Sequence, residues 1–229
     1  MSGDFFWRRV QSLAGLGLVV FLFFHLWTNA SASPWWGGEN VYAAAVNRIH
    51  AMPFLGWIEV GLLALPLLIH TLWGIVYLYS SSYNAFPTDG SAPALPEYPR
   101  NRAYTWQRLT AVLLIFGIAA HVAHMRWMEA PQAVSNEFEI QTAAGAVRAS
   151  SFGSAVWKMV QENFRSLPIQ VLYTLFVWTA VYHAFNGLWT FLITWGVTLS
   201  AHAQNVSRIV TRLLMIGLGF LGFLAIWGW

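Results

Sequence analysis

The chain contains no cysteine, and only 9% of its 229 residues are charged. Without cysteine it can form no disulfide, no thiolate metal site and no iron–sulfur cluster of its own, so any such cluster belongs to another protein. Soluble domains carry charge on about a quarter of their residues, so the low charge excludes an ordinary soluble domain. The twelve basic residues are scattered at the ends of apolar segments and give a net charge of only +3, which does not indicate nucleic-acid binding.

Long apolar runs are abundant instead. Hydrophobic residues make up 57% of the chain, and its tryptophans are typical of the aromatic belt at a membrane interface. About 20 apolar residues suffice for a helix to cross a bilayer. The runs that qualify cover about 10–28, 54–80, 104–127, 168–199 and 209–229. We therefore expect an all-α membrane protein, with five transmembrane helices forming one bundle domain over residues 1–229.

Two local features refine this expectation. Pro66 lies inside the second run, and we expect that helix to bend there because proline removes one backbone donor. The longest segment between runs covers about residues 128–167, and its apolar spacing predicts a short amphipathic helix around Ser154–Phe164. A polar, proline-bearing loop is expected from Ser81 to Arg102. We otherwise expect no soluble domain and no repeat, only five spans and their loops.

Basic residues near the ends of the runs indicate how the chain crosses the membrane. One group falls on the side of the N-terminus, and the other falls opposite, largely in the long 128–167 segment. The first group comprises Arg8, Arg9, Arg100, Arg102, Arg108, Arg208 and Arg212, and the second comprises Arg48, Arg126, Arg148, Lys158 and Arg165. Long loops count for less under the positive-inside rule. We therefore expect a cytoplasmic N-terminus and an external C-terminus.

Four of the runs each hold a histidine away from their ends. These residues are His25, His70, His121 and His183. An ionisable side chain is expensive inside a membrane and indicates a functional site. At about 1.5 Å per residue, His25 lies roughly 24 Å from the inner-side Arg9, and His121 lies roughly 20 Å from the inner-side Arg108. Both therefore belong to the outer half of the membrane.

The other two histidines lean toward the inner side. His70 lies roughly 15 Å from the inner end of its run near Ser80, and His183 lies past the middle of its run. One histidine pair at each depth predicts two stacked haems, each held by two histidines. Gly74 and Gly187 follow their histidines by one turn on the same face, which would leave room for a flat macrocycle. A bis-histidine haem has no open iron position, which favours electron transfer. A proton relay or transporter is the alternative.

Several motifs resemble one known family. They are RRVQSLAGL with FHLWTN, LPLLIHTLWG, WQRLTAVLLIFGIAAHVAHMR and YHAFNGLWTFLITWG, in order along the first four runs, while the resemblance as a whole covers all five. The chain resembles the five-helix, two-haem cytochrome b anchor of succinate dehydrogenases and fumarate reductases. The resemblance implies that His25 and His121 hold the outer, distal haem b, and that His70 and His183 hold the inner, proximal one. It also implies a flavoprotein subunit and an iron–sulfur subunit on the cytoplasmic face of a bacterial membrane, with menaquinone as substrate.

A second histidine competes for the distal position. His124 follows His121 by three residues and lies on nearly the same helix face. We prefer His121 because it is deeper, because Gly117 lies one turn before it, and because the resemblance aligns it. His124 is then expected near the interface, beside a haem propionate or the quinone. His50 and His202 are interpreted as solvated loop histidines.

Glu59 is the one acidic residue well inside a predicted span. It returns to the face of His70 after eleven residues, roughly 16 Å further out. Quinone reduction takes up protons, and a carboxyl whose pKa is raised by burial can deliver them. We therefore predict that Glu59 serves an outer quinone site, the alternative being an interfacial cap. Some fumarate reductases of this type carry a glutamate where this chain has Val181, which weakens that function here.

Taken together, the sequence predicts a succinate:quinone oxidoreductase anchor, with succinate chemistry on a partner chain. It would pass electrons from the iron–sulfur subunit through two haems to menaquinone. Arg8, Arg9 and Arg108 would pair with propionates of the inner haem, with the docked subunit or with lipid headgroups. The alternatives are electron flow from quinol to fumarate, or a haem-free anchor or proton-conducting subunit.

Overall fold

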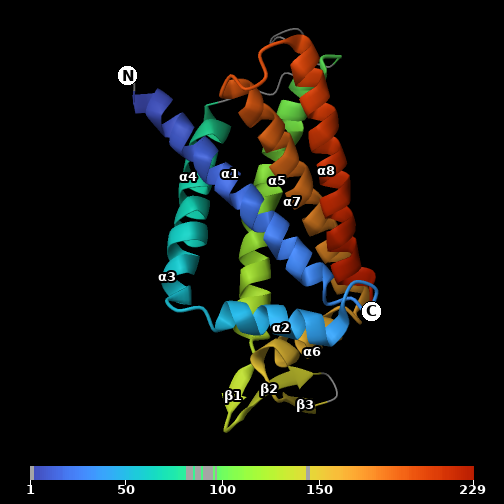
Figure 1. The fold of residues 1–229 in the computed structure, drawn as a ribbon. Coiled ribbons are helices and arrows are strands. Elements are labelled where there is room, and N and C mark those ends of the chain that lie inside the picture. Colours follow the sequence, from blue (N-terminus) through green and yellow to red (C-terminus); the bar gives the residue numbers. More distant parts are fainter. Residues whose placement is uncertain (1–2, 81–84, 86–88, 90–94, 96, 143–144) are drawn as a thin grey trace. The chain divides into compact units, whose positions relative to one another are not determined.

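A computed structural model describes residues 3–80, 85, 89, 95, 97–142 and 145–229. In this part of the chain, five helical segments are long and apolar enough to cross a membrane. They are α1 (Gly3–Ala30), the segment Leu55–Tyr79, the segment Pro99–Met128, α7 (Leu167–Thr194) and α8 (Ala201–Trp227). The predicted all-α membrane fold with five spans is therefore confirmed (Figure 1). The predicted loop from Ser81 to Arg102 lies mostly outside the described residues.

The chain packs as two compact units. The first comprises residues 1–21, 60–115 and 179–215, and the second comprises residues 22–59, 116–178 and 216–229. His70 and His183 belong to the first unit, whereas His25 and His121 belong to the second. The two histidine pairs that were sorted by depth therefore fall in separate units. The expectation of one bundle domain stays a prediction.

The second span changes its helical form near Pro66. It consists of α3 (Leu55–Glu59), the π-helix η1 (Val60–Ala64) and α4 (Leu65–Tyr79), in which Pro66 lies in the first turn. Proline has no N–H to donate to the carbonyl four residues earlier. A π-helical stretch before the proline is one way in which a membrane helix adjusts to the missing bond. The second span thus contains a π-helix that ends just before Pro66, and the predicted bend at this proline stays a prediction.

The boundary between the last two spans differs from the prediction. We expected the fourth span to reach Leu199 and the fifth to start near Ile209, but α7 ends at Thr194 and α8 begins at Ala201. Gly196 has φ +72°, a left-handed conformation that glycine adopts easily and that commonly ends a helix. The Ser200 Oγ accepts a bond from the Ala203 backbone N–H at 3.1 Å, which caps the start of α8. Local capping chemistry therefore overrides the length of the apolar run.

The second unit contains structure that the hydropathy pattern missed. Its helix α2 (Gly38–His50) was not predicted, and α6 (Phe152–Asn163) confirms the expected amphipathic helix. A three-stranded antiparallel sheet precedes α6 in the segment expected to be a loop. Its strands are β1 (Gln132–Val134), β2 (Glu137–Thr142) and β3 (Gly145–Ala149), in that order. Figure 1 shows α2 beside α6 and the sheet next to α6.

Helices α2 and α6 approach each other closely at Gly153. A Cβ atom on this glycine would lie only 2.7 Å from the Ala43 Cα and still closer to its carbonyl oxygen. The Gly153 backbone N–H donates to the Asn47 Oδ1 at 2.7 Å. Tyr42 is 3% exposed in the same helix, and burial raises the pKa of its phenol, which therefore stays neutral. The contact depends on glycine because the opposing atoms are backbone.

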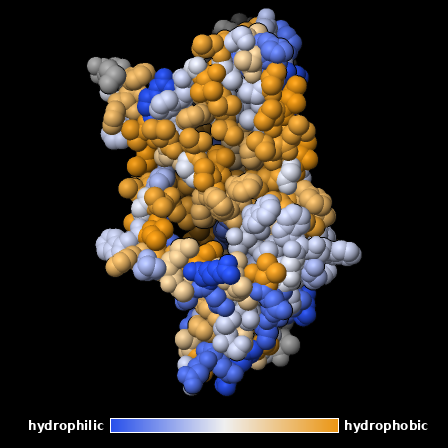
Figure 2. Space-filling model, in the orientation of Figure 1, coloured by the Kyte–Doolittle hydropathy of each residue, from blue (hydrophilic) through white to orange (hydrophobic). Residues whose placement is uncertain are grey.

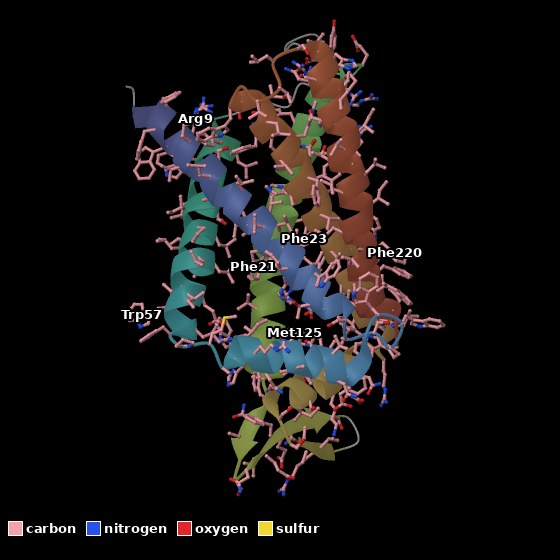
Figure 3. The ribbon with its side chains drawn as sticks, viewed as in Figure 1. Arg9, Phe21, Phe23, Trp57, Met125 and Phe220 are labelled. Atoms are coloured by element: carbon pink, nitrogen blue, oxygen red, sulfur yellow. The ribbon has the colours of Figure 1, made fainter. Side chains whose placement is uncertain are left out.

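The surface supports the membrane interpretation. Leu62 in the first unit and Phe116 in the second are each 71% exposed, and such apolar exposure fits a lipid environment. Figure 2 shows hydrophobic residues over the visible faces of the helices, while hydrophilic residues gather over the sheet. Trp57, labelled in Figure 3, points away from α3 and is 77% exposed, as expected for an interfacial tryptophan.

Candidate functional site

The first unit brings His70 of α4 and His183 of α7 together. Their ring centroids lie 6.2 Å apart, and the ring planes cross at 88°. The predicted pairing of these two residues therefore has a geometric counterpart in the structure. The two helices belong to two different candidate membrane spans. Two imidazoles from separate apolar helices therefore face each other.

Each of these histidines has a backbone carbonyl beside its Nδ1. The His70 Nδ1 lies 3.1 Å from the Gln11 carbonyl oxygen, and the His183 Nδ1 lies 3.2 Å from the Gln107 carbonyl oxygen. Because a carbonyl can only accept, each bond requires a proton on Nδ1. The Nε2 lone pair of each ring is then free to bind a metal, which is the arrangement that outer partners impose on metal-ligating histidines.

The same glutamines also reach the backbone of their histidines. The Gln11 Nε2 donates to the His70 carbonyl at 3.4 Å, and the Gln107 Nε2 donates to the His183 carbonyl at 3.0 Å. Each helix pair, α1 with α4 and α5 with α7, is therefore joined by a glutamine and a histidine bonded in both directions. Here α5 comprises Pro99–Val122. We call this arrangement the glutamine–histidine clamp.

The glycines one turn after these histidines lie beside the clamp amides. A Cβ atom on Gly74 would be 3.6 Å from the Gln11 Nε2, and one on Gly187 would be 3.2 Å from the Gln107 Nε2. The glycines thus give the glutamine side chains access to the histidine backbone. Their predicted role beside a macrocycle stays a prediction.

The two glutamines were not predicted from the sequence, although their polar side chains in apolar runs were a signal. Gln11 and Gln107 are polar residues within or beside apolar runs, where a side-chain amide needs an internal partner. Asn186, in the motif HAFNG, extends the second clamp by donating to the Gln107 Oε1 at 2.7 Å. The Thr110 Oγ1 lies 3.2 Å from the His183 Nδ1 and adds a second oxygen beside that ring nitrogen.

The second unit brings together His25 of α1 and His121 of α5. Their ring centroids are 5.9 Å apart, and the planes cross at 81°. His124 belongs to the π-helix η2 (Ala123–Met128), and its Nδ1 lies 2.9 Å from the Tyr173 hydroxyl. The same hydroxyl lies 3.4 Å from the His121 Nδ1. His121 therefore faces His25, while Tyr173 joins His121 to His124.

Gly117 supports the packing around His121. A Cβ atom on Gly117 would lie 2.6 Å from the Phe176 ring, and that ring is 5.6 Å from the His121 ring between centroids. The glycine therefore admits an aromatic ring that packs against the histidine. Tyr173 and Phe176 were both missed at the level of sequence, where they are two aromatic residues in a span rich in them.

The two pairs fit the spacing that a shared iron would require. Two metal–nitrogen bonds of about 2 Å, each with about 1 Å more to the ring centre, separate two imidazole centres by about 6 Å. The observed centroid distances of 6.2 Å and 5.9 Å meet this requirement. Within the described part of the chain, no group of three or more histidine, aspartate or glutamate side chains could hold a metal ion, but a haem iron needs only two protein ligands.

Glu59 makes an ion pair instead of standing alone in a buried site. Its carboxylate accepts two hydrogen bonds from the Arg126 guanidinium, at 3.0 Å and 3.4 Å. The Glu59 side chain is 37% exposed, so the carboxyl is only partly buried, and its predicted role at a quinone site stays a prediction. Arg126 belongs to η2 together with His124, and the ion pair therefore fastens the start of the second span to that π-helix.

The remaining predicted residues lie as follows. Arg9, labelled in Figure 3, donates to the Thr194 carbonyl at 2.8 Å, Arg8 lies over the Tyr77 ring, and Arg108 is 7% exposed beside Tyr104. Val181 is completely buried. His50 and His202 are exposed as expected, but they belong to the last turn of α2 and the first turn of α8 instead of loops.

Comparison with known proteins agrees with the motifs. The chain is 27% identical over 230 residues to the succinate dehydrogenase cytochrome b558 subunit of Bacillus subtilis (strain 168), covering 99% of this chain and 98% of the relative. No family model matches the chain. The similarity extends over nearly the full length of both proteins. The resemblance inferred from the motifs is thereby confirmed: the chain is a relative of the cytochrome b subunit of succinate dehydrogenase.

Proposed function

We propose that this chain is the membrane-anchoring cytochrome b of a succinate:quinone oxidoreductase, and that it carries electrons through two haems to menaquinone. The observation that carries the proposal is the presence of two crossed histidine pairs, each with the ring spacing of a shared iron. The full-length similarity to a succinate dehydrogenase subunit supports the same function. The proposal assigns His70 and His183 to the proximal haem and His25 and His121 to the distal haem.

The protein residues would hold and orient the two cofactors. Haem b, when bound, would supply one-electron transfer between the partner subunit and the quinone. His70 and His183 would bind through Nε2, because the Gln11 and Gln107 carbonyls hold their Nδ1 protons. The buried Arg108 in the same unit is suited to a propionate, which a guanidinium can bind with two parallel hydrogen bonds.

The chain requires partner subunits for the rest of the reaction. Without cysteine it holds no iron–sulfur cluster, so we propose a flavoprotein subunit for succinate oxidation and an iron–sulfur subunit for transfer to the haems. The arginines on the side of the N-terminus favour docking on the cytoplasmic face of a bacterial membrane. Val181 is apolar and cannot carry a proton at the position where some fumarate reductases have glutamate, which favours succinate oxidation over fumarate reduction.

Glu59 is proposed as a proton-handling residue of the quinone site. Its ion pair with Arg126 fastens it to the π-helix that follows His121, and its partial exposure leaves the carboxylate accessible. A positioned carboxylate of this kind can exchange a proton with a quinone oxygen. His124 lies in the same π-helix and shares Tyr173 with His121, so it is a second candidate for contact with the quinone or a propionate.

A redox titration of single-histidine variants tests the haem assignment. The wild-type complex is expected to show two one-electron optical steps, each with a slope of about 59 mV per tenfold change. His183→Gln and His121→Gln should each remove one step, and a different one. His124→Gln is the matched control, because it alters the neighbour of His121 and should keep both steps. Loss of a step in His124→Gln with both steps kept in His121→Gln would overturn the distal assignment.

A further inference from the structure

A cavity of about 380 Å³ lies in the first unit on a face that the histidine pair does not use. Three helices line it at the spacing of one helix face. Helices α5, α7 and α8 contribute four lining residues each, and those of α7 are residues 182, 185, 186 and 189. His183 is offset from the cavity-lining face of α7 by roughly 110°, at about 100° per residue.

The polar wall of this cavity is cationic. Arg102, Arg208 and Arg212 line it, and none of its lining residues, all within the described part of the chain, is acidic. The Arg208 Nε is buried and has no hydrogen-bond partner among the described residues. A buried guanidinium nitrogen without an acceptor is costly, and an anion in the cavity would supply that acceptor.

The other wall of the cavity is apolar and aromatic. Trp106, Phe185 and Trp189 line it, and the Trp189 Nε1 donates to the Gln204 carbonyl at 3.0 Å, which leaves the indole ring as an apolar surface. The cavity lies at the start of α5, in the second half of α7 and mainly in the first half of α8. Helix ends with tryptophan and arginine are typical of the headgroup level of a bilayer.

We propose that this cavity, the three-arginine pocket, binds the phosphate of an anionic phospholipid. Arginine forks match phosphate oxygens with paired hydrogen bonds, and basic pockets between transmembrane helices on the cytoplasmic side bind anionic headgroups. The aromatic wall would accommodate the glycerol and the first part of an acyl chain. The inference goes beyond the proposed electron-transfer function and uses none of the residues assigned to haem or quinone.

Native mass spectrometry of the complete, detergent-purified complex tests the inference. The complex is exchanged into a neutral detergent and incubated with dioleoyl phosphatidylglycerol, with dioleoyl phosphatidylcholine, or with phosphatidylglycerol plus millimolar inorganic phosphate. We expect tight retention of phosphatidylglycerol that phosphatidylcholine does not reproduce and that phosphate does not displace. The variant Arg208→Gln/Arg212→Gln should retain about tenfold less phosphatidylglycerol, because it removes two of three guanidinium groups.

Two further variants keep the test decisive. Arg165→Gln removes an exposed arginine that pairs with Glu162 and should retain lipid like the wild type. Arg212→Gln alone alters an exposed residue, so it should fold even if the double variant does not, and should weaken retention of phosphatidylglycerol.

Equal retention by all variants, equal retention of phosphatidylcholine, or displacement by inorganic phosphate would overturn the proposal. Binding only after the partner subunits are removed would assign the pocket to subunit docking instead. The haem content of each sample shows independently whether the electron-transfer proposal holds.

Discussion

Gly15 provides the sharpest structural test of the proximal histidine pair. A Cβ atom on Gly15 would lie 2.8 Å from the His70 Cε1 and 2.9 Å from its Nδ1, whereas ordinary contact begins near 3.4 Å. In Gly15→Ala the imidazole must therefore shift by about 0.6 Å or rotate, which strains its bond to the Gln11 carbonyl. Ligand sets tolerate displacements of only about 0.5 Å, so the His70 Nε2, which we propose as a haem ligand, would leave the position that binding requires.

The expected result is selective loss at one haem. Disturbing the support of a metal ligand lowers metal affinity by about 10- to 100-fold, so Gly15→Ala should bind the proximal haem weakly and keep the distal one. The measurement is haem content per complex after extended washing, with a redox titration to show which step is lost. Alanine favours helix over glycine by about 0.5 to 1 kcal/mol, so weakening of α1 cannot explain such a loss.

Gly17 provides the matched control on the same helix. A Cβ atom there would meet nothing within 4 Å, so Gly17→Ala should keep both haems at wild-type affinity. If Gly15→Ala binds both haems as tightly as Gly17→Ala does, then His70 is not held as the structure indicates, and the clamp argument fails.

The remaining predictions concern Glu59, the proposed carboxylate of the quinone site, and the contact of α2 with α6. Glu59→Gln should lower the rate of quinone reduction by about 10²-fold or more, with haem content unchanged. Arg126→Gln breaks the same ion pair but keeps the carboxylate, so it should lower this rate less. An unchanged rate in Glu59→Gln would show that Glu59 does not take part in quinone reduction. Gly153→Ala should destabilise the second unit by about 1–3 kcal/mol, because its Cβ meets backbone of Ala43. A lowered melting temperature of the complex relative to the control Gly217→Ala, which meets nothing within 4 Å, would show this, and equal melting would contradict it.

Much of the arrangement of the histidines was predictable, because the fixed rise per residue of a membrane helix relates a residue's position in the sequence to its depth in the membrane. His25 and His121 could be paired without a structure, since helical rise places each at a known distance from charged residues at the membrane surface. The choice of His121 over His124 was also accessible, and the contact between the His25 and His121 rings agrees with it. Assignment of these residues as haem ligands stays a prediction.

Contacts between helices could not be predicted in the same way. The glutamine–histidine clamp depends on how α1 and α5 are rotated toward α4 and α7, and hydropathy carries no information on rotation about a helix axis. The pairing of Glu59 with Arg126 depends on side chains 67 positions apart. Depth alone placed the Glu59 carboxyl inside a span, and it could not show that an arginine from another span reaches it.

The sheet and the ends of the helices were missed for a different reason. Strands β1 to β3 are short and carry charged residues such as Glu137 and Arg148, so they resemble a loop when only apolar runs are counted. Likewise, the polar first turns of α8 are helical although its apolar run begins later. Hydropathy identifies the part of a helix that lies in lipid, while capping residues such as Ser200 determine where the helix begins.

A haem count on the purified complex tests the central claim most directly. The pyridine haemochrome method gives moles of haem b per mole of this chain, independently of turnover, quinone or redox potential. The account predicts two haems per chain, one for each crossed histidine pair. A count of one would show that one pair does not hold iron, and a count of zero would contradict the electron-transfer function altogether.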